Sequence, residues 1–323
     1  MSFQDIPQIE SSEFYLDLAF RRAKEVAIKA KKIKQRAADT FVDKIKTVEI
    51  AKLNTIYQVL RDSLGIILFK FPSIDGMPSF YRALVGCTME YSEVKIALGS
   101  LKWAVTRLSS LKNIYSSRVR LSRDMGALGK HSKEFYGRTA SVMKQMDKHF
   151  NIIRDARKIL IAFPVVKTGM KTVVIAGMPN VGKSTLLSTL TGSKPKIAHY
   201  PFTTKQLMIG YDGDVQYIDT PGLLDRPLSK RNKIEQQAIL ALKHVASVVV
   251  FIIDPTEYCG YPVKDQLSLL SEIKKLLSLP VIAVANKADA VESSLKALSI
   301  SAEKKTGIDE LKKEILKYLK QAE

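Results

Sequence analysis

The sequence contains little cysteine, histidine or tryptophan: two Cys, four His and one Trp in 323 residues. Cys87 and Cys259 lie far apart and lack the spacing of a metal site, so we expect them to pack as small residues in a reducing cytoplasm. The histidines form no ligand or triad pattern. These absences leave no support for a disulfide framework, a zinc site or histidine-based catalysis.

Long apolar runs are also missing. No run approaches the ~20 residues that a helix needs to cross a bilayer, and the longest, residues 245–254, is typical of a buried strand. The acidic first fourteen residues lack the apolar stretch of a secretory signal. Neither a glycine after Met1 nor a C-terminal cysteine motif is present to carry a lipid. We therefore expect a monomeric cytoplasmic protein with no membrane partner.

Positive charge, in contrast, is abundant and unevenly distributed. The net charge is +19, and residues 1–160 contribute +13 of it, from 29 Lys/Arg against 16 Asp/Glu. A basic surface attracts phosphate backbones by releasing their counterions. The first half of the chain is therefore the predicted nucleic-acid-binding half.

The two halves have different periodicity. Residues 10–160 place apolar side chains at steps of three and four, which predicts helices, and residues 70–80 interrupt them with two prolines and a glycine. From residue 171, short β-branched runs alternate with helical stretches, which predicts a mostly parallel sheet with helices on both faces. The fold class is thus an all-α helical bundle, residues 1–163, followed by an α/β P-loop domain, residues 164–323.

The stretch GMPNVGKST follows a predicted strand and opens a predicted helix, as a phosphate-binding loop requires. Its glycines allow the backbone to wrap a phosphate at a helix N-terminus, Lys183 should neutralise the β- and γ-phosphates, and Ser184 should ligate Mg²⁺. The whole loop is predicted to bind the nucleotide: Gly177, Met178, Pro179, Asn180, Val181, Gly182, Lys183, Ser184 and Thr185.

The stretch NKAD, which contains Asn286, Lys287 and Asp289, follows another predicted strand and indicates guanine. A carboxylate at Asp289 accepts from both N1–H and the exocyclic amine of guanine, whereas adenine would leave it facing an acceptor, at a cost of ~1–3 kcal/mol. We predict that a backbone amide of Ser301 or Ala302 donates to the guanine carbonyl.

Sensing elements lie between these two motifs. In YPFTT, residues 200–204, Thr204 is the predicted Mg²⁺-ligating threonine, with Thr203 as the alternative. Asp219 should reach the metal through water, and Gly222 should donate its amide to the γ-phosphate. The predicted cofactors are accordingly GTP or GDP with Mg²⁺, and K⁺ as discussed below.

These residues resemble the Obg-like group of translation-factor-related GTPases, in which YPFTT and DTPG followed by a hydrophobic residue are typical. Residues 91–101, 220–242 and 259–266 are similar to the nucleolar GTP-binding protein 1 family, in its short, archaeal-type form. The resemblance implies a helical bundle, a GTPase domain, and work on the precursor of the large ribosomal subunit and its rRNA, with other assembly factors as further partners.

The position after DTPG holds Leu223, where many GTPases have a glutamine that orients the attacking water. We therefore predict a slow GTPase whose catalytic residues are Asn180, Lys183, Thr204 and Gly222. A partner raises such rates ~10⁵-fold, or about 7 kcal/mol. The stabilisation of the transition state that Leu223 cannot supply could come from another side chain, from the ribosome, or from a K⁺ ion at Asn180. Leu223 could also simply pack on an apolar surface.

Residues 21–36 hold eight cations and one acid, and predict an rRNA contact rather than only a solvated face. The RNA-binding candidates are Arg21, Arg22, Lys24, Lys29, Lys31, Lys32, Lys34, Arg36, Arg118, Arg120 and Arg123. Trp103 and the scattered Tyr and Phe are expected in the core. Two alternatives stay open: an RNA-binding scaffold in which GTP is structural, and a GTPase that acts on mature ribosomes.

Overall fold

The computed structural model describes residues 3–32, 40–192, 195–199, 206–227, 231, 233–291 and 295–321. The chain forms two compact units. The helical unit comprises Gln4–Pro72 and Glu90–Lys158, and the sheet unit comprises Met1–Phe3, Ser73–Met89 and Ile159–Glu323. The sheet unit thus includes Ser73–Met89, a segment that the sequence boundary at residue 163 assigned to the helical half.

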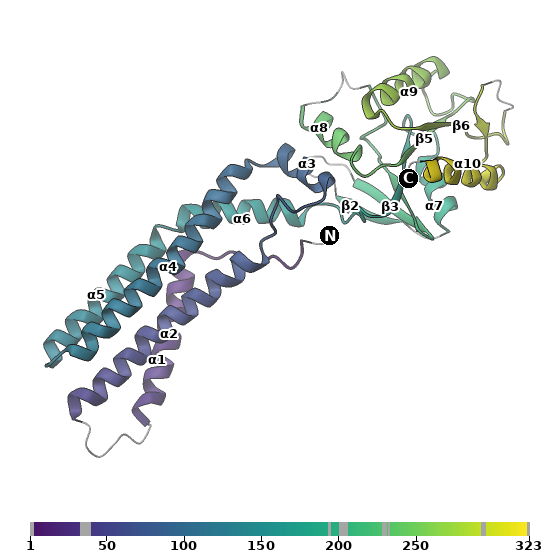
Figure 1. Cartoon of the computed structure of the whole chain (residues 1–323). Helices are drawn as coiled ribbons and strands as arrows, with labels where there is room; N and C mark the ends of the chain where they lie inside the picture. The colour runs from purple at the N-terminus through teal and green to yellow at the C-terminus, as the bar shows by residue number, and fades with distance from the viewer. Residues whose placement is uncertain are drawn as a thin grey trace. The chain divides into compact units, whose positions relative to one another are not determined.

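The helical unit is an antiparallel bundle, as the periodicity predicts (Figure 1). Helix α1 packs against α2, α2 against α4, and α4 against α5, which also returns to α1. The helices are α1 (Ser12–Lys32), α2 (Phe41–Lys70), α4 (Tyr91–Leu121), α5 (Met125–Lys144) and α6 (Asp147–Ile161).

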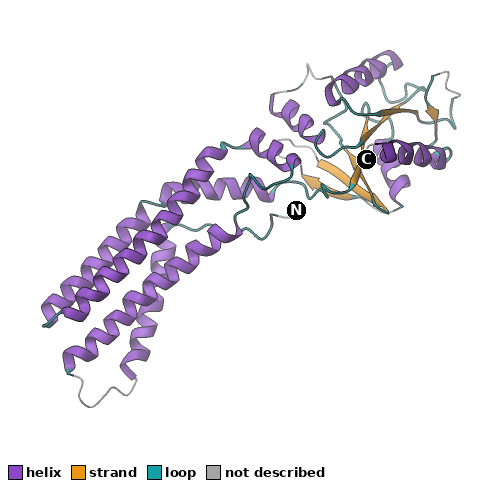
Figure 2. Ribbon diagram, viewed as in Figure 1, coloured by secondary structure: helices purple, strands orange, loops and turns teal. Residues whose placement is uncertain are grey.

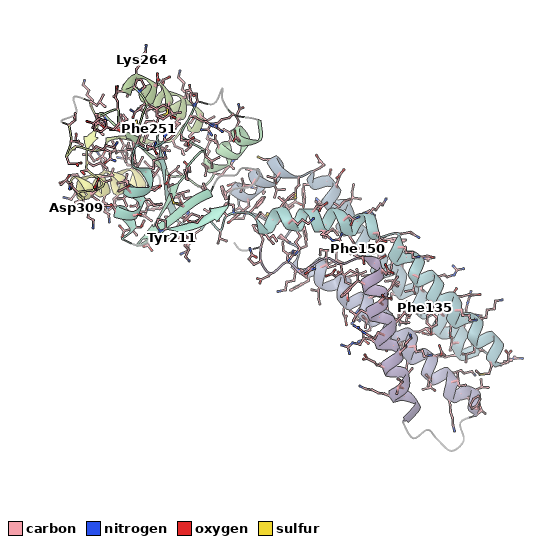
Figure 3. The ribbon with its side chains drawn as sticks, turned by 180° about the vertical axis from the view of Figure 1, so that it is seen from behind. Phe135, Phe150, Tyr211, Phe251, Lys264 and Asp309 are labelled. Atoms are coloured by element: carbon pink, nitrogen blue, oxygen red, sulfur yellow. The ribbon has the colours of Figure 1, made fainter. Side chains whose placement is uncertain are left out.

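The core of the bundle follows the predicted apolar positions. In α2, the buried side chains include Leu53, Ile56, Leu60 and Leu64. In α4 the buried seam is Val94, Ala97, Leu101, Ala104 and Leu108, so the predicted Leu98 and Val105 lie at its half-buried edge. Phe135 and Phe150 add large aromatic rings to this core (Figure 3).

One expected core residue lies elsewhere. The indole of Trp103 is 49% exposed, so the prediction that it is a core side chain is wrong. Helical periodicity explains the difference, because the α4 seam runs through Leu101 and Ala104 and leaves Trp103 on a neighbouring face.

The sheet unit is built on seven strands in the order β2-β3-β4-β1-β5-β6-β7, with helices on both faces (Figure 2). The strands are β1 (Lys171–Ala176), β2 (Lys196–His199), β3 (Gln206–Asp212), β4 (Val215–Asp219), β5 (Val248–Ile253), β6 (Val281–Ala285) and β7 (Leu298–Ser299). The helices are α3 (Ser79–Thr88), α7 (Lys183–Thr191), α8 (Lys233–Leu242), α9 (Val263–Leu277) and α10 (Ile308–Gln321).

The strands pair in parallel from β4 to β7, whereas β2–β3 and β3–β4 are antiparallel. The mostly parallel sheet is therefore confirmed, and the four predicted β-branched runs correspond to β1, β4, β5 and β6. Parallel pairing places the carboxyl ends of these strands on one edge, since Ile175 pairs with Asp219 and Ile253 with Ala285. The loops that carry the predicted motifs leave from this edge.

Helix α3 joins the sheet unit by packing against α8. The hydroxyl of Tyr81 accepts from the Val166 amide at 3.0 Å and lies 3.1 Å from the carbonyl oxygens of Pro164 and Val166. Tyr81 is fully buried, so these bonds hold the segment that leads into β1. No helix in the described ranges has the length and apolar character of a membrane span.

Candidate nucleotide-binding site

The loop between β1 and α7 folds tightly because two glycines adopt conformations that side chains rarely take. Gly177 has φ +143° and Gly182 has φ +101°. A Cβ on Gly177 would lie 2.6 Å from the Ile252 carbonyl oxygen, and one on Gly182 would collide with the Asn286 side chain. The sequence therefore needs glycine at both places to bring the loop against β5 and β6.

The Lys183 ammonium lies inside this loop. It donates to the carbonyl oxygens of Gly177 at 2.9 Å and Met178 at 2.7 Å, and the residue is buried. Burial lowers the pKa of Lys183, while the carboxylates of Asp219 and Asp225 act in the opposite direction. The loop thus holds a cation that an anion can draw toward itself without a change of fold.

The oxygen ligands predicted for a metal ion are already together. Ser184 Oγ donates to Asp219 Oδ2 at 2.7 Å, and Asp219 is fully buried. Its other oxygen, Oδ1, has no hydrogen-bond partner, and burial raises the pKa of Asp219 despite the Ser184 hydrogen bond. A buried carboxylate oxygen with no partner, beside a hydroxyl, fits a hard divalent cation such as Mg²⁺. In the described ranges no three His, Cys, Asp or Glu side chains cluster as a metal site.

The base-recognition residues are joined to the phosphate loop through Asn286. Its Nδ2 donates to the Val181 carbonyl at 2.9 Å, and its Oδ1 accepts from the Ala302 amide at 2.9 Å. Asp289 is exposed, and a hydrogen bond with Ser301 lowers its pKa, so that it is ionised and ready to accept. The structure therefore brings the predicted residues of three distant motifs together.

Lys287 makes a contact that the sequence analysis missed. Its ammonium lies 2.6 Å from Oδ2 of Asp254, which is fully buried and also accepts from the Cys259 amide at 2.9 Å. Burial opposes ionisation of Asp254, but the hydrogen bonds from Lys287 and Thr256 outweigh it and lower its pKa. The available signal was an acid placed directly after the buried strand β5, at the edge of the sheet where ligands bind.

The segment after β4 connects the phosphate loop to α8. Gly222 has φ +77°, and Leu223 is fully buried, which confirms the packing alternative for this side chain. The Leu224 carbonyl accepts from the Gly177 amide at 3.1 Å. Arg231, which was not predicted, is buried and donates to the Gly222 carbonyl at 3.1 Å. The sequence around it gave no sign that this charge is buried.

The remaining predicted residues divide into two groups. Asn180, Ser184 and Thr185 are exposed. Asn180 also has a left-handed backbone conformation, with φ +61°. Thr203 and Thr204 lie outside the described residues, so their assignment stays a prediction.

Of the RNA-binding candidates, seven are exposed on the helical unit: Arg21, Arg22, Lys24, Lys29, Arg118, Arg120 and Arg123. Two of them have partners, because Arg22 pairs with Glu25 at 3.0 Å and Arg118 lies 3.5 Å from Glu134. Lys34 and Arg36 lie outside the described residues, as do the side chains of Lys31 and Lys32.

Comparison with known proteins finds relatives of both halves of the chain. The family model described as the NOG1 N-terminal helical domain matches residues 3–167, and that of nucleolar GTP-binding protein 1 (NOG1) matches residues 233–289. A protein of Methanocaldococcus jannaschii, named only as uncharacterized, is 41% identical over 290 residues, which are 90% of this chain and 81% of that protein. Nucleolar GTP-binding protein 1 of Drosophila melanogaster is 32% identical over 77% of this chain but only 39% of its own length.

Among solved structures, one described as nucleolar GTP-binding protein 1 of Plasmodium falciparum has 29% identity and a TM-score of 0.44, over 49% of this chain and 91% of that one. The family assignment rests on the first family model, which spans half of the sequence. The chain belongs to the nucleolar GTP-binding protein 1 family.

Proposed function

We propose that this chain binds GTP and GDP, hydrolyses GTP slowly, and acts as a switch in the assembly of the large ribosomal subunit. The observation that carries the guanine assignment is the arrangement around Asn286, which ties the phosphate loop to the Ala302 amide beside the ionised Asp289. Asp289 would accept from N1–H and the exocyclic amine of guanine, and the Ala302 or Ser301 amide would meet the carbonyl. Relatives named as GTP-binding proteins support the same reading.

The phosphate side supports a γ-phosphate sensor. Lys183 would leave the Gly177 and Met178 carbonyls for the β- and γ-phosphates, and the Gly222 amide would donate to the γ-phosphate. Ser184 and Asp219 would hold Mg²⁺, Asp219 through water, and the ion would supply charge neutralisation for the phosphates. Thr204 is proposed to complete this set.

The buried Leu223 sets a limit on the rate. Its side chain offers no hydrogen bond and faces the apolar interior, so it can neither orient water nor block the phosphate. Asn180 is the residue proposed to hold K⁺ against the phosphates, and the precursor particle is the alternative source of stimulation.

The helical unit is the proposed rRNA-binding part, in the cytoplasm and on the ribosomal precursor. The support is the +13 charge of residues 1–160 and the exposure of seven predicted cations. The nucleotide state of the sheet unit would then decide when the chain binds and leaves the particle.

The direct test is calorimetric titration of the nucleotide-free protein with GDP and ADP in Mg²⁺. We expect GDP to bind at least ~100-fold more tightly than ADP, because Asp289 loses both of its bonds with adenine. Equal affinities would contradict the guanine assignment. The Lys183→Ala variant then separates a switch from a scaffold: a scaffold would still support subunit assembly and leave the particle on time, and a switch would not.

A further inference from the structure

The helical unit contains a cavity of about 470 Å³ where α4 faces the junction between α5 and α6. Small-ligand pockets have volumes of ~300–1,000 Å³, so this cavity is of a size to hold a ligand. Residues of α4, including Gly99 and Trp103, form one wall, and the other is formed by Gln145, Met146, Lys148 and His149. We call it the Trp103 pocket.

The pocket exists because the two helices break at this place. Helix α5 ends at Lys144, the Gln145 amide bonds back to Ser141, and α6 begins at Asp147. Opposite the break, a Cβ on Gly99 would meet no atom within 4 Å, so no side chain fills the floor. A glycine that packing does not require leaves the backbone open to a ligand.

An aromatic face is available in the pocket. Trp103 is 49% exposed, and Ile96, about two turns before it on α4, is 64% exposed. Both are among the large apolar side chains that folding usually buries. In the described part of the chain the indole nitrogen of Trp103 has no hydrogen-bond partner. The ring can therefore stack on a planar group and donate one hydrogen bond.

A buried histidine adds a polar group to the opposite wall. His149 is 9% exposed, and its Nδ1 is enclosed without a partner. Burial lowers its pKa, and the neighbouring Lys148 charge acts in the same direction, so the ring is neutral. Because Nδ1 is enclosed, Nε2 is the ring nitrogen that can form a hydrogen bond with a ligand. Figure 3 labels Phe150, the buried neighbour that fixes this turn of α6.

The charge around the pocket is positive. Lys148 is one of its lining residues, and Lys144 precedes the break on an exposed position. The acid at the junction, Asp147, accepts from the Ser12 amide at 3.0 Å and its hydroxyl at 2.8 Å, so it is engaged with the start of α1. The lining itself contains no acid, which favours an anionic ligand.

We infer that the Trp103 pocket binds one unpaired nucleotide of an RNA strand. The base stacks on the Trp103 indole, His149 Nε2 forms a hydrogen bond with its edge, and Lys148 neutralises its phosphate. The inference rests on the proposed rRNA binding of the helical unit, and adds where the contact lies and that the RNA is single-stranded there.

Trp103 is the chain's one tryptophan, so tryptophan emission, excited at the red edge where tyrosine does not absorb, reports on this pocket alone. The full chain is titrated at low salt with a single strand of roughly ten nucleotides, within the ~4–16 that single-strand sites span, and separately with its duplex. A fluorophore on the RNA measures total binding in parallel. We expect the single strand, and not the duplex, to quench Trp103. Trp103→Ala should weaken single-strand binding about 5- to 150-fold, and Trp103→Phe much less.

Phe69→Ala is the matched control, because Phe69 is an 84% exposed aromatic elsewhere on the helical unit, and its binding should equal that of the wild type. Labelled RNA that binds without quenching, and equally to Trp103→Ala, would overturn the pocket while leaving the proposed rRNA binding intact. Equal quenching by the duplex or by free AMP would also overturn it. If no RNA binds at all, the proposed rRNA function fails and the pocket fails with it.

Discussion

The Arg231 guanidinium donates a hydrogen bond to the Gly222 carbonyl oxygen at 3.1 Å and another to the Arg226 carbonyl at 2.8 Å. Its side chain is only 1% exposed and lies 3.6 Å from the Asp225 carboxylate. Arg231 thus holds the backbone of Gly222, the glycine that is proposed to sense the γ-phosphate, through a side chain nine positions later in the sequence. Because Leu223 follows that glycine, the same contact helps to keep Leu223 in the apolar interior.

Replacing Arg231 by Ala should destabilise the sheet unit by about 3–5 kcal/mol, the cost of removing one partner of a buried charged network. The Gly222 and Arg226 carbonyls would lose their donor, and the Asp225 carboxylate would lose its neighbouring positive charge. Urea unfolding of the nucleotide-free protein measures the change. Lys312→Ala is the control, because its pair with Asp212 is exposed and should contribute ~0–1 kcal/mol. Similar decreases in the free energy of unfolding in both variants would show that the Arg231 hydrogen bonds do not stabilise the sheet unit.

Replacing Asp289 by Asn should exchange guanine for xanthine. The amide cannot accept from both guanine donors, but its NH₂ can donate to the carbonyl that xanthine has in place of the exocyclic amine. We expect GDP affinity to fall ~100-fold or more, and xanthosine diphosphate to bind where the wild type does not bind it. Calorimetry with both nucleotides measures this. Asp309→Asn, an exposed acid in the first turn of α10, should leave GDP binding unchanged.

Replacing Asp254 by Asn should lower stability by about 1–3 kcal/mol at pH 7, since Lys287 and the Cys259 amide lose a charged acceptor. The pKa of Asp254 is lowered below its ordinary 3.8, so the carboxylate's contribution is present above that value and is lost as the pH falls through the folded-state pKa. The difference between variant and wild type should therefore stay constant from pH 7 to about pH 5 and shrink only below about pH 4. A difference that shrinks near pH 6 would contradict this pairing.

Asp219 should show the opposite dependence. Burial raises its pKa above 3.8, so the folded state binds this proton more tightly than the unfolded chain does. Stability from this group therefore increases as the pH falls from 7 toward 4, and Asp219→Asn should lose that slope. Urea unfolding of the nucleotide-free protein at several pH values measures it. Equal slopes for variant and wild type would show that the Asp219 charge is compensated in the folded state.

The sequence predicted those parts of the fold whose periodicity has one interpretation. Residues 91–121 repeat apolar side chains at helical steps, and residues 248–253 are a short, mostly β-branched apolar run, which favours a buried strand. Strand β2 was missed because Lys196–His199 is short and lies at the edge of the sheet. The association of α3 with the sheet was missed because Tyr81 of α3 contacts Pro164 and Val166, and α3 packs on α8, all of which are far from α3 in sequence.

The site was predictable where backbone conformation demands a residue type. Gly177 and Gly182 are required by positive φ and close contacts, and this requirement is what a loop motif records. The burial of Arg231 and the pairing of Asp254 with Lys287 were not predictable, because both depend on how the partners of a charge fold around it. Trp103 shows the reverse case, in which a residue type usual in cores lies at a surface pocket.

Potassium should raise GTP turnover if Asn180 holds a cation against the phosphates. Leu223 is buried and supplies no water-orienting group, so the transition-state charge needs another source, and a fixed monovalent cation supplies it without a partner protein. We expect faster turnover in KCl than in NaCl at equal ionic strength, and loss of this difference in Asn180→Ala with GDP affinity little changed. Asn151→Ala, in the helical unit, is the control. Equal rates in the two salts would leave the ribosomal precursor as the source of stimulation, since Asn180 would then only shape the loop at φ +61°.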